Sequence, residues 1–144
     1  MIRVKKISQE QLLPLIEKAF QGDIELFEKY HEYPCGEQEC ILAVFEKIKG
    51  LKGVEKPSYY TVLLGDKAIG FFVVSYKRLY SFGIALKFRR KDILKKWWEL
   101  LKKIVGKEFI CSLYKNNTRA IAFLLRQGMQ IGEIRNNIVT LIHY

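Results

Sequence analysis

The sequence predicts an α/β fold in which helices flank a mixed, mostly antiparallel central sheet. Three observations support this fold class. The chain has 144 residues, which suits a single domain over residues 1–144 and is short for two. Its 49% hydrophobic and 28% charged residues are typical of a globular chain with a full core. The spacing of the apolar residues changes along the chain between that of strands and that of helices, an order typical of helices packed on a sheet.

The first third of the chain is predicted to be mainly helical. The expected elements are a strand over residues 2–7, a helix from Ser8 to Gly22, and helices over residues 23–31 and 37–49. Ser8 followed by Glu10 and Gln11 is a typical helix start. Asp23 is a candidate N-cap for the second helix, because its carboxylate can accept bonds from free backbone amides.

Strands dominate the rest of the chain. The expected elements are strands over 59–64, 68–76, 79–86, 109–114, 131–134 and 138–144, with helices over 92–105 and 117–127. Residues 65–67 (GDK) are a typical hairpin turn between the first two of these strands. Asp92 is the candidate N-cap of the first helix and Gly106 its stop signal.

The net charge of +10 is concentrated in one part of the chain. Residues 77–144 contain 15 Lys and Arg against 4 Asp and Glu, whereas the first 76 residues contain 10 against 11. The basic residues are densest over 87–107. A cluster of this kind attracts polyanions: nucleic acid, an acidic membrane surface or the phosphates of a cofactor. A solvated helix face on a basic protein is the alternative interpretation.

Targeting signals and metal ligands are not apparent in the sequence. No stretch approaches the ~20 apolar residues of a membrane-spanning helix, and the N-terminus lacks the apolar region of a secretory signal. We therefore expect a cytoplasmic protein without a membrane partner. The cysteines (Cys35, Cys40 and Cys111) are expected to be free thiols, since no pair has zinc-ligand spacing. No metal site is predicted.

One helix carries a recognisable motif. Residues 117–129 (NTRAIAFLLRQGM) resemble the fourth-helix motif of the GNAT N-acetyltransferases, approximately N-x-x-A-x-x-x-Y-x-K-x-G-F. The matching positions are Asn117, Ala120 and Gly128, with Arg126 keeping the positive charge. Leu124 stands where the family usually has tyrosine. The predicted element order is also similar to that of the family over nearly the whole chain, so the resemblance implies a GNAT-like acyltransferase fold.

This resemblance implies a CoA thioester and an amine acceptor as partners, with acetyl-CoA as cofactor. In the family, a loop patterned R/Q-x-x-G-x-G/A at the start of the long helix holds the pyrophosphate. Here Arg89 fills the first position, but Asp92 and Leu94 replace the two small residues. The residues that the resemblance assigns to the cofactor are Ile84, Ala85, Leu86, Arg89, Arg90, Lys91, Asp92, Ile93, Leu94 and Asn117.

The departure from the glycine pattern has two opposed interpretations. Side chains at residues 92 and 94 narrow the approach to the backbone amides, and a capping Asp92 would occupy the amides and repel a phosphate. The surrounding basic side chains, in contrast, could hold the phosphates directly. The same cluster would also suit a different polyanion.

Two residues are candidates for proton transfer. Tyr114 is the nearest phenol in sequence to the position of the missing tyrosine and could protonate the leaving thiolate. His31 has a suitable intrinsic pKa for a general base and lies in the N-terminal helical region, which borders the acceptor site in this fold. The alternative for each side chain is a structural role, as an aromatic at the edge of the core for Tyr114 and as a surface histidine for His31.

Three functions remain open from the sequence. The first is a GNAT-like N-acetyltransferase acting on an unidentified amine. The second is a non-catalytic binding or structural protein that kept the fold and lost the cofactor site. The third is nucleic-acid binding through the basic helix, which gains support only if Trp97 and Trp98 are exposed for stacking.

Overall fold

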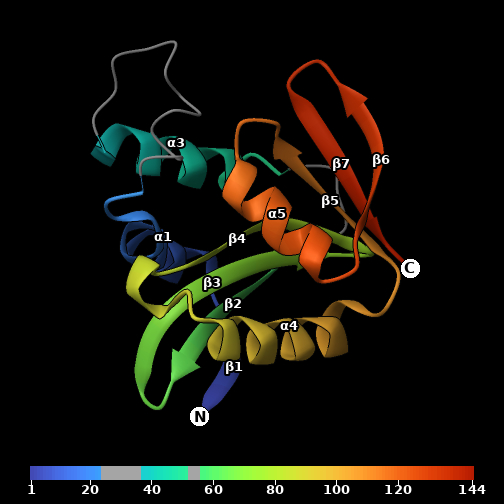
Figure 1. The fold of residues 1–144 in the computed structure, drawn as a ribbon. Coiled ribbons are helices and arrows are strands. Elements are labelled where there is room, and N and C mark those ends of the chain that lie inside the picture. The colour runs from blue at the N-terminus through green and yellow to red at the C-terminus, as the bar shows by residue number, and fades with distance from the viewer. Residues whose placement is uncertain (24–36, 52–55) are drawn as a thin grey trace.

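A computed structural model describes residues 1–23, 37–51 and 56–144, and Figure 1 shows a central sheet with helices against it. The strands are β1 (Ile2–Ile7), β2 (Ser58–Leu64), β3 (Lys67–Ser75), β4 (Arg78–Ile84), β5 (Phe109–Tyr114), β6 (Gln130–Arg135) and β7 (Ile138–His143). The helices are α1 (Leu12–Phe20), α3 (Glu37–Lys49), α4 (Lys91–Val105) and α5 (Thr118–Arg126), with 3-10 turns η1 (Gln9–Gln11) and η2 (Leu86–Phe88).

The strands form one seven-stranded sheet in the order β1-β2-β3-β4-β5-β7-β6. Neighbouring strands are antiparallel except for β4 and β5, which run parallel. The mixed, mostly antiparallel sheet flanked by helices confirms the fold class predicted from the sequence.

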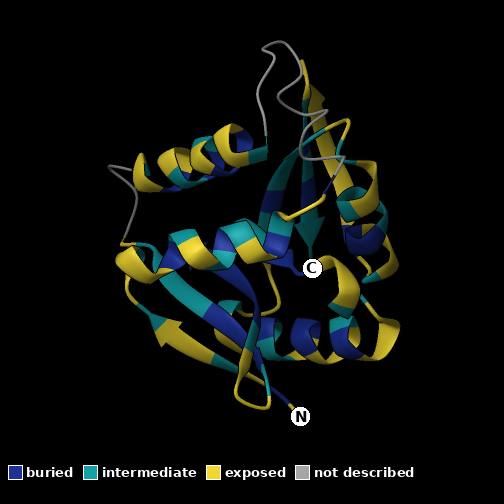
Figure 2. Cartoon of the chain, turned by 90° about the vertical axis from the view of Figure 1, so that its left-hand side faces the viewer, coloured by how far each residue is buried: buried dark blue, intermediate teal, exposed yellow. Residues whose placement is uncertain are grey.

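Helices cover both faces of the sheet, and the core therefore has two parts. Phe71 and Val73 of β3 face a cluster with α1 and α3, whereas Phe72 and Val74 face a cluster with α4 and α5. A strand buried on both faces needs consecutive apolar residues, which is why β3 reads FFVV at its centre. Figure 2 shows the buried residues of each helix turned toward the sheet and the exposed ones turned away.

The indole rings of α4 are central to the second core cluster. Trp97 and Trp98 are 1% and 2% exposed, and both rings pack against Phe123 of α5 at 5.7 Å between centroids. Neither indole can stack on a nucleic-acid base. Nucleic-acid binding through the basic helix would gain support only from exposed tryptophans, and both tryptophans of this helix are buried.

One predicted cap is wrong. The N-cap of α4 is Arg90 rather than Asp92, because the helix begins at Lys91 and the N–H of Leu94 donates to the carbonyl of Arg90. Asp92 lies in the first turn, where a negative charge is still favourable to the helix dipole. The predicted helix over residues 23–31 lies outside the described residues, and the other predicted elements agree with the structure to within a few residues at their ends.

No helix among the described residues is long and apolar enough to cross a membrane.

Close packing between β3 and β4 makes Gly70 a sensitive position. An alanine Cβ there would collide with the Gly83 carbonyl oxygen and would lie 2.6 Å from Cδ1 of Ile84. We expect Gly70→Ala to lower the free energy of unfolding by about 1–3 kcal/mol, because the strands must move apart. Chemical denaturation measures the change.

Gly50→Ala is the matched control. Its Cβ would lie 3.4 Å from the Glu46 carbonyl oxygen, an ordinary contact, and the expected change is within about 0.5 kcal/mol. Equal denaturation midpoints for the two variants would contradict this account of the β3–β4 packing.

Candidate functional site at the fork of two strands

Strands β4 and β5 part soon after they meet. Their parallel pairing joins only Arg78 to Ile110 and Leu79 to Cys111. A bulge in the β3–β4 ladder shifts the register at the same level, since Val73 pairs with Ser81 and the next residue of β3 pairs with Leu79. Tyr80 is thus left out of the ladder. Bulges bend strands, and this one lies where β4 turns away from β5.

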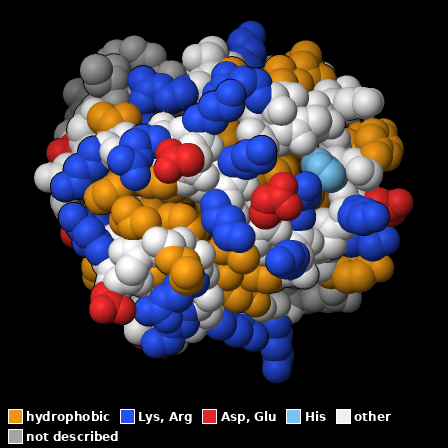
Figure 3. All heavy atoms as spheres, turned by 60° about the horizontal axis from the view of Figure 1, so that its bottom comes forward, with side chains coloured by type: hydrophobic (Ala, Val, Ile, Leu, Met, Phe, Trp, Pro, Cys, Tyr) orange, Lys and Arg blue, Asp and Glu red, His pale blue; other side chains and the backbone are white. Residues whose placement is uncertain are grey.

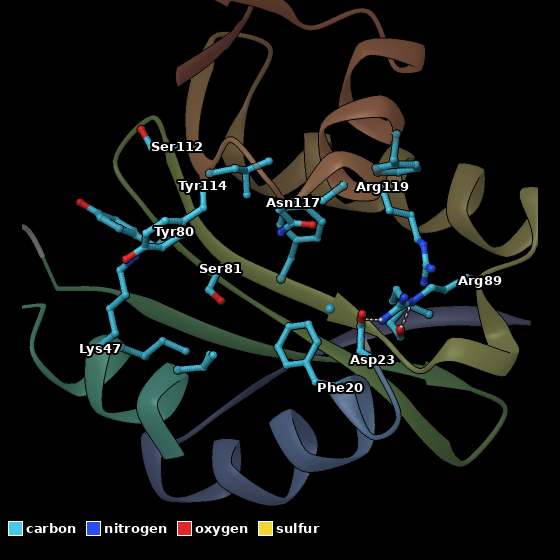
Figure 4. A pocket seen from close by; sticks show the side chains of 18 of the residues that line it. Phe20, Asp23, Lys47, Tyr80, Ser81, Arg89, Ser112, Tyr114, Asn117 and Arg119 are labelled. Atoms are coloured by element: carbon cyan, nitrogen blue, oxygen red, sulfur yellow. Dashed lines mark hydrogen bonds and ion pairs between the residues drawn. The ribbon is translucent and has the colours of Figure 1, made fainter. Parts of the chain in front are cut away.

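The fork opens into a cavity of about 300 Å³. Its wall combines β4 and β5 with the end of α1, part of α3, the start of α4 and one side of α5. Figure 4 shows Lys47, Tyr80, Tyr114 and Ser112 toward one end and Asp23, Arg89 and Arg119 toward the other. The cavity therefore connects the α1–α3 side of the sheet with the α4–α5 side.

Arg89 is tied into the fold at the edge of this cavity. Its Nε donates to the Ile84 carbonyl at 2.7 Å, and its Nη2 donates to the Ala19 carbonyl at 3.2 Å and to Oδ2 of Asp23 at 2.7 Å. The side chains of Arg89 and Asp23 are only 18% and 9% exposed. This ion pair joins the end of α1 to the turn after β4, so much of the guanidinium's bonding capacity is used within the protein.

The second carboxylate oxygen of Asp23 is different. Oδ1 is buried and has no hydrogen-bond partner among the described residues. Sequence reasoning assigned Asp23 to helix capping and gave no reason to place it beside Arg89, 66 residues away. Asp23 is therefore a cavity residue that the sequence analysis missed, as is Lys47, whose place on α3 gave no functional signal.

The start of α4 is open. No side chain caps this helix end in the part of the chain that the structure describes. Arg90 and Asp92 form a weak surface pair, with 3.8 Å between Nε and Oδ1 and with side chains 63% and 77% exposed. Lys91, Lys95 and Lys96 are also exposed. Figure 3 shows Lys and Arg side chains spread over this face of the molecule.

A second group of cations lies around the neighbouring turn η2, with Lys87 on the turn and Lys67 at the start of β3. The Nζ atoms of Lys67 and Lys87 lie over the ring of Phe88, at 5.1 and 5.3 Å from its centroid. The positive charge of Lys87, followed by desolvation, lowers the pKa of Lys67 below its usual value, and Lys18 adds a smaller effect. The turn after β4 is therefore a region of positive potential.

The cavity brings together part of the predicted site. Among its lining residues are Ile84, Arg89, Leu94, Asn117 and Tyr114. Asn117 is the N-cap of α5 but makes no side-chain capping bond, so its amide is not used by the helix.

Tyr114 lies at the end of the cavity toward α3. Nζ of Lys47 is 4.9 Å from the centroid of its ring. Leu124, which occupies the position of the family's tyrosine, is 0% exposed and belongs to the core. Leu124 therefore gives the cavity no phenol. The tyrosines that line the cavity come from other elements, and Tyr114 of β5 is one of them.

Other predicted residues lie around the cavity or beyond the described chain. Ala85 and Ile93 are buried, Leu86 is 46% exposed on η2, and Lys91 and Arg90 are exposed at the start of α4. His31 lies outside the described residues, so its prediction as a base is untested. No group of three or more His, Cys, Asp or Glu side chains suited to a metal ion is present in the described chain.

Known structures share this architecture. An acetyltransferase from Thermus thermophilus is similar with a TM-score of 0.73 and 12% sequence identity, covering 99% of this chain and 96% of that one. A GNAT-family acetyltransferase from Streptococcus agalactiae has a TM-score of 0.65 and 13% identity, with coverages of 99% and 94%. The chain has the GNAT fold.

A further structure with the GNAT fold contains a ligand. The PaiA N-acetyltransferase from Thermoplasma acidophilum, in complex with coenzyme A, is similar with a TM-score of 0.67 and 15% identity, covering 100% of this chain and 99% of that one. No model of a protein family matches the sequence, and no curated protein matches it either. The fold is thus clear although little of the sequence is shared.

The Asp23–Arg89 pair is expected to matter for stability. Asp23→Ala leaves a largely buried guanidinium without its counter-ion, and we expect it to lower the free energy of unfolding by about 2–4 kcal/mol. The exposed pair of Arg3 and Asp66, with side chains 57% and 105% exposed, provides the control. Asp66→Ala should cost less than about 1 kcal/mol in the same denaturation experiment. Similar losses for the two variants would refute the structural role of Asp23.

Proposed function

We propose that this protein is an acetyl-CoA-dependent N-acetyltransferase whose active site is the fork between β4 and β5. The observation that supports this most directly is the early parting of the two strands. Past Leu79, β4 has no strand partner on its β5 side in the described chain, so alternate backbone N–H and C=O groups face the cavity. An extended amide-bearing arm, such as pantetheine, can bond to such groups.

The residues present are compatible with the phosphates of the cofactor. No side chain of the described residues caps the start of α4, and its backbone amides and the positive end of the helix dipole both favour an anion. Arg90, Lys91 and Lys95 are exposed beside it and can add charge-assisted bonds. An objection from the sequence was that a capping Asp92 would occupy the amides that a phosphate needs. Asp92 does not cap the helix, so its carboxylate does not take these amides.

The middle of the cavity suits the arm of the cofactor. Phe82, Trp97 and Phe123 provide apolar wall, and Asn117 provides an amide that can donate to or accept from the arm. The volume of about 300 Å³ is enough for the arm but not for the nucleotide, which would lie outside against the basic surface.

When bound, acetyl-CoA supplies an acetyl group activated as a thioester. The acceptor nitrogen forms the new C–N bond, the C–S bond breaks, and the products are an acetamide and the CoA thiol. The chain's own contribution is to hold the acceptor beside the fork and to supply a proton to the sulfur. We assign this proton transfer to Tyr114, which lies with Tyr80 at the α3 end of the cavity. His31 stays a prediction for the base that accepts the amine's proton.

Cofactor binding can be tested with two neighbouring asparagines. Acetyl-CoA at 100 times its Kd should add about 2.7 kcal/mol of stability in a thermal-shift or calorimetric titration. Asn117→Ala should weaken binding by about 3- to 10-fold, the effect of one lost hydrogen bond. Asn116→Ala, at an exposed position that does not line the cavity, should leave the affinity unchanged. No stabilisation at millimolar acetyl-CoA would exclude the proposed function.

The role of Tyr114 predicts a specific kinetic effect. With a primary-amine panel as acceptors, Tyr114→Phe should lower kcat by about 10²-fold or more while changing KM little, as expected for a group that acts on the leaving sulfur. Release of the CoA thiol measures the rate. Tyr76→Phe, at a 71% exposed position, is the control. An unchanged kcat in Tyr114→Phe would remove Tyr114 from the mechanism.

A further inference from the structure

The two edges of the sheet differ in a way that the proposed function does not explain. β1 forms one edge and carries Arg3, Lys5 and Lys6, all exposed. Like charges on an edge strand repel a second copy of the same strand and so prevent edge-to-edge pairing. β6 forms the other edge, and its charges are of both signs. In Figure 1 it lies at the outer side of the β6–β7 hairpin.

Every residue of β6 is exposed. Ile131 and Ile134 are 49% and 62% exposed, and they pair with Leu141 and Val139 of β7, which are buried in the core. Paired residues of neighbouring strands share a face of the sheet. The two isoleucines therefore extend the apolar face of the sheet out to its edge, where no described helix covers them.

The charged residues of β6 flank one of these isoleucines. Glu133 and Arg135 lie on the opposite face from Ile134, and their side chains form an ion pair of 3.3 Å. They are 58% and 80% exposed, so both charges are accessible to a partner from outside. Residues 133–135 read Glu, Ile, Arg. A two-fold rotation about the central isoleucine places the Glu of one copy opposite the Arg of the other.

We propose that β6 pairs antiparallel with β6 of a second copy of this chain, about a two-fold axis at Ile134. In this register the two Ile134 side chains lie opposite each other on one face. On the other face, Glu133 of each copy lies opposite Arg135 of its partner, which gives two cross-strand ion pairs. The two sheets become one continuous sheet, and the interface is isologous.

This register satisfies three needs at once. Backbone groups of residues 133–135, at an edge that no strand of the described chain pairs, gain partners, an exposed isoleucine becomes covered, and each charge faces its opposite. The β1 edge does not offer the same fit, because full-length antiparallel pairing of two β1 strands would place Arg3 of each copy opposite Lys6 of the other. A second copy is therefore the occupant that the chemistry of the β6 edge fits.

Charge exchange tests the register. The contact is short and would bury less than the ~1,200 Å² of a standard interface, so the mass is measured at about 100 µM by light scattering or sedimentation equilibrium. The wild type should have twice the mass of one 16.9 kDa chain. Glu133→Arg and Arg135→Glu should each give the mass of one chain, because like charges then face each other. The double variant should regain the doubled mass.

Controls keep the result interpretable. Asp66→Arg reverses a charge in an exposed ion pair far along the chain and should leave the doubled mass unchanged. Circular dichroism checks that each variant is folded, which is expected because the changed side chains are exposed. A wild type with the mass of one chain overturns the proposal. So does a doubled mass that is insensitive to both single variants, or a double variant that fails to regain it.

A cross-link tests the axis directly. Opposed residues of an antiparallel pair have Cα atoms about 4.5–5.5 Å apart, within the range that a disulfide spans. In a Cys35→Ser background, where Cys40 and Cys111 are buried, Ile134→Cys should oxidise to a covalent dimer. Ile131→Cys should not, since the same axis places it opposite Asn137. The reverse result, or no cross-link from either cysteine, overturns the proposed register.

Discussion

The separation of β4 from β5 is the constraint on which the rest of the site depends. Two residue pairs hold the strands together at one end, and the bulge that leaves Tyr80 out of the ladder bends β4 away. Because the gap opens in the middle of the sheet, it is lined by helices from both faces and connects them. Past Leu79, the backbone groups on this side of β4 therefore have no strand partner within the described chain.

The basic residues of the chain have two different roles in the structure. Arg89, the basic residue that matches the family's loop, is held by Asp23 and two backbone carbonyls, so it joins α1 to the turn after β4. The lysines on α4 and η2 remain at the surface, and the positive charge of Lys87 on η2, followed by desolvation, lowers the pKa of Lys67 at the start of β3. Part of the basic cluster therefore stabilises the fold, and the exposed part produces the positive potential beside the fork.

Local sequence patterns predicted the helices and strands well, because residues close together in the chain decide where each helix, strand and turn forms. The alternation in residues 2–7, the GDK turn and the wide apolar stripe of α4 each reflect burial on one face or a tight turn. The N-cap of α4 was wrong by two residues, since Arg90 holds that position without a capping side chain. For the site, the helix motif named Asn117, and Tyr114 was named as the phenol nearest in sequence to Leu124, but nothing local predicted Asp23 or Lys47 at the cavity.

The sequence by itself determined the fold class, the order of the elements and the helix motif, because these follow from the periodicity of apolar residues and from turn residues close together in the chain. The tertiary structure alone decided what happens to individual side chains. It paired Arg89 with Asp23, packed both indole rings of α4 against Phe123, and left β6 as an exposed edge. Each of these outcomes depends on residues far apart in sequence, and a local pattern carries no information about such contacts.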